Sequence, residues 1–148
     1  MSATALAVLF TAAAGIAAAL QVAINGRLGA RIGTLEAATF QTIVALILFV
    51  AVTAALRGGM GGVASGLRQP AWMWLGGIMG FVIVSALTYA PGRIGNLTFA
   101  AILIALQLTA ATLIDTFGLF GFERIGLSAQ RLGGLALLAA GTALVLKR

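Results

Sequence analysis

Two polar residues within the apolar stretch from about 96 to 118 could take part in chemistry. Gln107 and Asp115 are eight residues apart, so they lie on one face of a helix. Asp115 is the only acidic residue well inside an apolar segment, and an ionisable group in a membrane usually faces the bundle interior or a water-filled cavity. The pattern predicts a substrate- or proton-binding site at Asp115, with Gln107 as its hydrogen-bonding neighbour.

Arg131 supports a different interpretation of Asp115. It stands near the start of the next apolar segment, after a short loop, so the two residues lie on the same side of the membrane. An ion pair between Asp115 and Arg131 would only clip two helices together. From the sequence, both interpretations stay open.

A second polar group lies near the end of the first apolar segment. Gln21 and Asn25 are four residues apart and share a helix face, which makes both candidates for binding a substrate or a proton. Glu36 opens the next segment, where a helix dipole favours an acid. It is either an interfacial cap or a partner for Arg27 or Arg31. Gln41, one turn deeper, is a further candidate for lining a cavity.

The remaining chemistry is limited by what the chain lacks. There is no cysteine and no histidine, which removes the thiolate nucleophile, the imidazole base and the usual metal ligands. No phosphate loop or metal-ligand cluster is present. We therefore expect no enzyme activity, no metal and no cofactor. The nine basic residues are scattered at the ends of apolar stretches, which argues against a nucleic-acid partner despite the net charge of +6.

These residues must be positioned by membrane helices. Hydrophobic residues make up 61% of the chain and charged residues 8%, against about 25% charged in soluble domains. We predict an all-α integral membrane protein in contact with the lipid bilayer, built as one domain (1–148) of five transmembrane helices. The predicted helices are about 3–24, 35–56, 70–90, 96–118 and 127–146, with a flexible glycine-rich linker after the second. Gly76 and Gly80 form a GxxxG pair that predicts close helix packing.

The basic residues are divided almost evenly between the two membrane faces. The N-terminal side would carry Arg57, Arg68, Arg124 and Arg131, and the other side Arg27, Arg31, Arg93, Lys147 and Arg148. An excess of lysine and arginine on one side normally sets orientation. Either another signal decides it here, or the chain inserts both ways. Two copies could then pack antiparallel and reproduce the inverted repeat of many secondary transporters.

Three segments carry a resemblance to a known family. They are Gln21 to Gly29, Trp74 to Gly80 with Ala90 to Gly95, and Gln107 with Asp115 to Gly121. Over nearly its whole length the chain resembles the five-helix, half-sized YdcZ-like family of bacterial inner-membrane proteins, in the drug/metabolite transporter superfamily. Thr116 stands where that family often has histidine, and Leu106 where it often has glycine. The resemblance implies a small-molecule transporter, with export as one direction, that pairs with an inverted five-helix unit.

The leading functional hypothesis is a secondary transporter that works by alternating access in an antiparallel homodimer. Gln21, Asn25, Gln107 and Asp115 would line or support its cavity. The alternatives are a dual-topology ion channel and a non-transporting membrane assembly subunit. The sequence names no substrate, although a buried acid between apolar walls suggests a cationic amphiphile.

Overall fold

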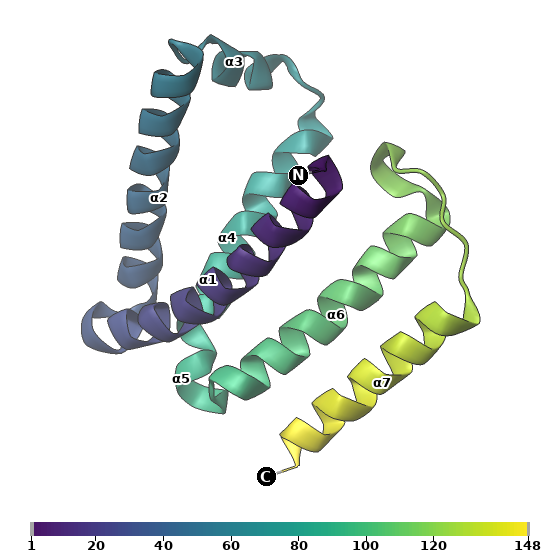
Figure 1. Cartoon of the computed structure of the whole chain (residues 1–148). Coiled ribbons are helices and arrows are strands. Elements are labelled where there is room, and N and C mark those ends of the chain that lie inside the picture. The colour runs from purple at the N-terminus through teal and green to yellow at the C-terminus, as the bar shows by residue number, and fades with distance from the viewer. Residues whose placement is uncertain (1, 148) are drawn as a thin grey trace. The chain divides into compact units, whose positions relative to one another are not determined.

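The computed structural model describes residues 2–147, and they are almost entirely helical (Figure 1). Five helical stretches are long and apolar enough to cross a membrane: Ala3–Ile32, Thr34–Arg57, Ala71–Ile94, Asn96–Phe117 and Ala129–Leu146. In each of them, at most 11% of the most apolar 18-residue stretch is buried. Apolar side chains on that scale are stable only against lipid or a partner. The predicted all-α fold with five membrane-length helices is confirmed.

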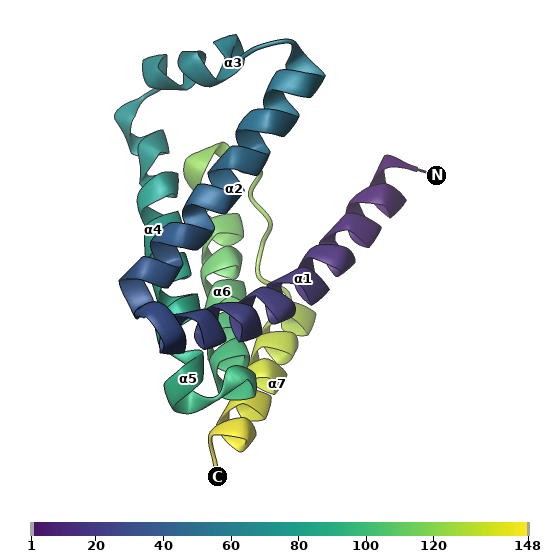
Figure 2. The same ribbon diagram turned by 90° about the vertical axis from the view of Figure 1, so that its left-hand side faces the viewer.

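The chain folds as two compact units, residues 1–93 and 94–148. Unit 1 contains α1 (Ala3–Ile32), α2 (Thr34–Arg57) and α4 (Leu75–Tyr89). In Figure 1, α2 and α4 diverge toward the segment that joins them, and in Figure 2 the N-terminal half of α1 leads away from both. The three helices therefore pack at one end of the unit. The buried residues of the three helices lie there: Val22, Asn25, Ala37, Ala38, Leu87 and Thr88.

The first helix continues to Ile32, eight residues beyond the predicted end, so that predicted boundary is wrong. Asn25 is the first residue after the predicted helix. It remains helical, and its side chain donates a hydrogen bond to Gln41 on α2. The helix stops at Gly33, whose φ of +102° is available to glycine at little cost. Its 30 residues span roughly 45 Å, more than the ~30 Å hydrocarbon core, so α1 tilts or extends beyond it.

The glycine-rich connection after α2, which was expected to be a linker, is partly helical. It contains the short turns α3 (Gly61–Ala64) and η1 (Ser65–Arg68). The third long segment then begins with a 3₁₀ turn, η2 (Ala71–Trp74), continues as α4, and ends in α5 (Pro91–Ile94). Backbone amides in this connection, such as those of Val63 and Gln69, find carbonyl partners within the connection itself.

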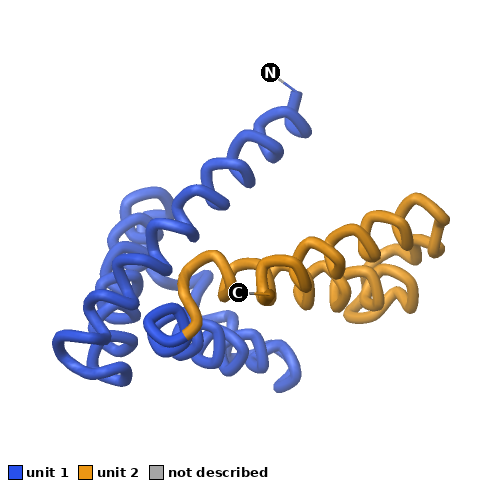
Figure 3. The backbone as a smooth tube through the Cα atoms, turned by 90° about the horizontal axis from the view of Figure 1, so that it is seen from below, with its two compact units in different colours: residues 1–93 blue, residues 94–148 orange. Residues whose placement is uncertain are grey.

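Unit 2, orange in Figure 3, is a pair of packed helices, α6 (Asn96–Phe117) and α7 (Ala129–Leu146), with the turn η3 (Leu119–Gly121) between them. Thr142 Oγ1 donates to the Ala101 carbonyl at 3.3 Å and so ties α7 to α6. The last helix begins two residues later than predicted, because Ser128 Oγ accepts from the Arg131 amide and caps it.

The closest helix contact in unit 1 is made by a different glycine from the predicted pair. A Cβ built on Gly29 of α1 would lie 2.9 Å from Thr88 Cγ2 and 3.3 Å from the Thr88 carbonyl on α4. A Cβ on Gly76 or Gly80 would meet no described atom within 4 Å. Among the glycines of α1 and α4, Gly29 therefore makes the tightest contact with another helix, and Gly76 and Gly80 adjoin open space.

Candidate functional site

The turn at Gly33 brings three amide side chains of unit 1 together. Asn25 lies eight residues before Gly33 and Gln41 lies eight residues after it. Because α1 and α2 reverse direction there, residues at equal distance from the turn face each other at the same height. Gln21, one turn before Asn25, lies on the same face of α1. The three residues, Gln21, Asn25 and Gln41, are called the amide cluster below.

The hydrogen bonds of the amide cluster converge on one atom. Asn25 Nδ2 donates to Gln41 Oε1 at 2.6 Å, and Gln21 Nε2 donates to the same oxygen at 3.2 Å. Asn25 is only 1% exposed. Gln41 Nε2 is buried and has no hydrogen-bond partner among the described residues. The Gln41 side chain is therefore satisfied at its oxygen and unsatisfied at its nitrogen.

A cavity of about 460 Å³ adjoins the cluster between α2 and α4. Gln21 and Gln41 reach its wall, Gly77 and Gly80 leave room on the α4 side, and Phe81 covers part of it. Its other lining residues are Leu35, Ala38, Thr39, Thr42, Ile43, Ala45, Leu46, Val84 and Ser85. The volume falls in the range of about 300–1,000 Å³ typical of small-molecule sites.

The cavity wall carries hydroxyl groups in two different states. Thr42 Oγ1 donates to the Ala38 carbonyl at 2.8 Å and is satisfied within its own helix. Ser85 Oγ is buried and has no hydrogen-bond partner in the part of the chain that the structure describes. An unpaired buried polar group costs roughly 1–3 kcal/mol. Gln41 and Ser85, two residues that line the cavity, therefore each hold one unused hydrogen-bonding group.

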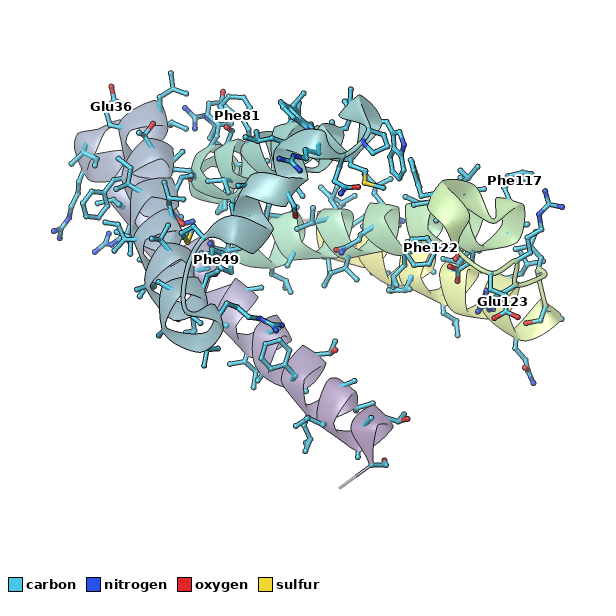
Figure 4. The ribbon with its side chains drawn as sticks, turned by 90° about the horizontal axis from the view of Figure 1, so that it is seen from above. Glu36, Phe49, Phe81, Phe117, Phe122 and Glu123 are labelled. Carbon is cyan, nitrogen blue, oxygen red and sulfur yellow. The ribbon has the colours of Figure 1, made fainter. Side chains whose placement is uncertain are left out.

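Asp115 and Arg131 meet in unit 2. Arg131 Nη1 lies 3.4 Å from Asp115 Oδ2, and both side chains are about one-third exposed, at 34% and 36%. The Asp115 carbonyl accepts from the Ile125 amide at 2.9 Å, which ties the connection between α6 and α7 to the last turn of α6. Figure 4 labels Phe122 and Glu123 on this connection. Within unit 2, the arrangement therefore holds the connection between the two helices.

The remaining predicted residues are more isolated. Gln107 is exposed on α6 and has no hydrogen-bond partner among residues 2–147. Glu36 lies in the first turn of α2, at the edge of unit 1 (Figure 4), with its carboxylate close to Gly33. Neither Glu36 nor Arg27 forms an ion pair with a described residue. The carboxylate of Glu36 is thus placed to interact with the N-terminal end of the α2 dipole.

Sequence reasoning missed the central part of the site. Gln41 was expected only to line a cavity, whereas its Oε1 atom accepts hydrogen bonds from both Gln21 and Asn25. The sequence did contain a signal for this contact, because Asn25 and Gln41 are equally distant from Gly33 along the chain. Ser85 gave none, because a single serine in an apolar helix usually bonds to its own backbone, and only the fold reveals that this hydroxyl is unpaired.

Residues 6–144 match the family described as "Putative inner membrane exporter, YdcZ". The chain belongs to this family. It is a multi-pass protein of the inner membrane, as the five membrane-length helices also indicate. Neither the curated proteins nor the solved structures include a match. The family supplies a coarse function, membrane transport rather than catalysis, and the geometry of unit 1 supplies the candidate site.

Proposed function

We propose that this protein is a secondary transporter that exports small molecules by alternating access, with the cavity beside the amide cluster as its solute site. The observation that supports this most directly is the cavity itself. It has a volume of about 460 Å³ and a mostly apolar lining, and two of its lining residues, Gln41 and Ser85, each contain a buried polar atom without a described partner. Polar groups inside a membrane helix are costly and usually mark a solute or ion pathway.

The depth of the site agrees with this role. Gln41 is the eighth residue of α2, which places it roughly 12 Å along the helix and well inside the ~30 Å hydrocarbon core. Secondary transporters bind their solutes near the bilayer midplane, where water and lipid headgroups do not compete for hydrogen bonds. In this proposal the Asp115–Arg131 pair is a structural clip rather than the proton-binding group.

The proposed working unit is an antiparallel homodimer. Four basic residues lie on one predicted face and five on the other, so the charges give almost no preference for one orientation. A Lys147→Cys variant tests this, since the natural chain has no cysteine. Labelling of about half the protein in intact cells by a membrane-impermeant maleimide is expected. Labelling of nearly all or nearly none would replace the homodimer by a single orientation.

Counterflow separates a carrier from the alternatives. Cells that express the chain are first challenged with toxic solutes of different charge, for example chloramphenicol, ethidium and tetraphenylphosphonium. A solute to which tolerance rises is then loaded unlabelled into proteoliposomes, and its labelled form is added outside. A carrier transiently accumulates the label above equilibrium.

Other outcomes of the counterflow assay point to the other two functions. Flux without counterflow, at rates far above about 10³ per second, would indicate a channel. No flux of any solute, together with a stable partner of different sequence, would indicate an assembly subunit.

A further inference from the structure

We propose that the cavity between α2 and α4 selects uncharged, largely apolar solutes, and that it holds them through a hydrogen-bond acceptor on the solute, such as a ketone, amide or sulfoxide oxygen. The inference rests on the proposed function, because it names the class of solute that this site would carry. It follows from the charge of the cavity wall, the direction of its free hydrogen bonds and its shape.

The charge of the wall comes first. The residues that line the cavity include no acid and no base. A cationic solute would lose its hydration without gaining a counter-charge, which is a large cost in a medium of low dielectric constant. A neutral solute has no such cost. The cavity therefore favours a different solute from the cationic amphiphile that a buried acid suggests.

The direction of the free hydrogen bonds is determined by the amide cluster. Gln41 Oε1 accepts from Asn25 and Gln21, which leaves Nε2 as the unused end of the side-chain amide. Reversing Gln41 alone would set its NH₂ group against two other NH₂ groups, so a reversal requires Asn25 and Gln21 to turn as well. The buried Gln41 Nε2, which has no described partner, is therefore a free donor on a residue that lines the cavity. It can bind an acceptor and cannot accept from a solute.

Ser85 lies across the cavity from Gln41, on α4, and its buried hydroxyl is the second unpaired group. A hydroxyl can donate to the same solute oxygen that Gln41 would bind. Gly77 and Gly80 lie on the same helix, and a Cβ at either would meet no described atom within 4 Å. The rest of the site therefore offers space and apolar surface, which suits an aromatic or branched body attached to the acceptor.

Benzophenone is a suitable probe, because it is a neutral two-ring ketone whose carbonyl is both the acceptor and the photoreactive group. On irradiation the excited carbonyl abstracts a hydrogen from a nearby C–H bond, and the two radicals join in a C–C bond. Purified full-length protein in nanodiscs is photolabelled over a range of benzophenone concentrations. Adducts are mapped by mass spectrometry. We expect saturable labelling on the segments of α2 and α4 that line the cavity.

Substitutions at the cavity wall test whether the two unpaired groups and the open volume beside Gly80 are needed for binding. Gln41→Met keeps the length of the side chain and removes its donors together with the acceptor that Asn25 and Gln21 bind. Ser85→Ala removes only the unpaired hydroxyl and is therefore the cleaner test of a donor. Each substitution should raise the benzophenone concentration at half-maximal labelling by roughly 3- to 10-fold, which corresponds to the loss of one hydrogen bond. Gly80→Leu should abolish cavity labelling by filling open space. Gln130→Met on α7 is the matched control for loss of a glutamine, and helical circular dichroism with a single elution peak checks the fold of every variant.

Competition identifies the solute class with three compounds of the same two-ring skeleton. Diphenyl sulfoxide is a neutral acceptor, diphenylmethane has no acceptor, and benzhydrylammonium is a cation. Strongest competition by the sulfoxide supports the proposal. Equal competition by diphenylmethane would overturn it by indicating simple apolar partition, as for a lipid chain, and strongest competition by the cation would overturn it by indicating charge recognition.

This test can fail independently of the proposed function. Labelling that is unchanged in Gln41→Met, Ser85→Ala and Gly80→Leu would overturn the inference even if counterflow of another solute is observed. Cavity labelling that depends on Gln41, in a protein with no flux of any solute, would instead overturn the transporter and leave the binding site standing.

Discussion

The amide cluster of unit 1 and the Asp115–Arg131 pair of unit 2 are two answers to the problem of polar side chains in a membrane. The amide cluster is neutral, contains a residue that is only 1% exposed, and leaves a buried donor unpaired beside a cavity. The ion pair is charged, about one-third exposed, and joined to a loop. In this protein the buried neutral group contains an unpaired donor, and we propose that this group, rather than the charged pair, binds the solute.

Removal of Asn25 should have the largest effect and would sharpen the comparison most. Asn25→Ala removes the 2.6 Å bond to Gln41 from a fully buried position. We expect a loss of roughly 1–3 kcal/mol in the free energy of unfolding, because Gln41 Oε1 then retains only the longer bond from Gln21. The measurement is SDS-induced unfolding of purified protein, with Gln130→Ala as the control. A loss no larger than that of the control would show that the cluster does not hold α1 to α2.

The contact that positions the cluster gives the next prediction. Gly29→Ala would place its Cβ 2.9 Å from Thr88 Cγ2, so we expect a loss of about 1–2 kcal/mol from overpacking. Adding Thr88→Ser removes that methyl group and keeps a hydroxyl for the bond to the Val84 carbonyl, and it should restore most of the stability. Gly76→Ala, in open space, is the matched control. Failure of the double variant to recover would assign the cost to the backbone contact instead.

The ion pair should contribute little by comparison. A double-mutant cycle with Asp115→Asn and Arg131→Gln should give a coupling below about 1 kcal/mol, since pairs with this degree of exposure are weak. In the counterflow assay, Asp115→Asn should retain transport and its response to a pH gradient. A well-folded Asp115→Asn protein without transport would reverse the comparison, and would return Asp115 to the role of proton- or substrate-binding residue.

The smallest effect is expected at Gln107. Its side chain is exposed and has no hydrogen-bond partner within residues 2–147, so Gln107→Leu should change the free energy of unfolding by no more than about 0.5 kcal/mol. Export should also be unchanged. The free energy of unfolding and the counterflow of the variant are measured in parallel with those of the natural chain. Loss of export with normal stability would extend the functional site to α6.

Much of the fold could be predicted, because lipid selects for it directly. A chain with 61% hydrophobic residues and stretches of about 20 apolar residues can cross a membrane only as helices. The boundaries were less predictable. Asn25 and Gly26 resemble a helix end, yet α1 continues past them. A polar side chain ends a membrane helix only if it has no partner, and the partner of Asn25 is on another helix.

The candidate site could be predicted only in part. Spacing placed Gln21 with Asn25, and proximity along the chain suggested the pairing of Asp115 with Arg131. The convergence on Gln41 depends on the turn at Gly33, and the free hydroxyl of Ser85 depends on what lies around it. GxxxG spacing singled out Gly76 and Gly80, but the close contact in unit 1 occurs at Gly29, because the angle at which helices cross decides which small residue meets its neighbour.

The sequence by itself determined that this protein spans the inner membrane with five helices, lacks the residues for common enzyme and metal chemistry, and belongs to its exporter family. The helices follow from composition and periodicity, the missing chemistry follows from the residue types, and the family and its membrane follow from the motifs that the chain shares with it. The tertiary structure alone decided which polar atoms remain without partners and that space lies beside them. Hydrogen-bond satisfaction is a property of neighbours from different helices, so it appears only once the helices are packed.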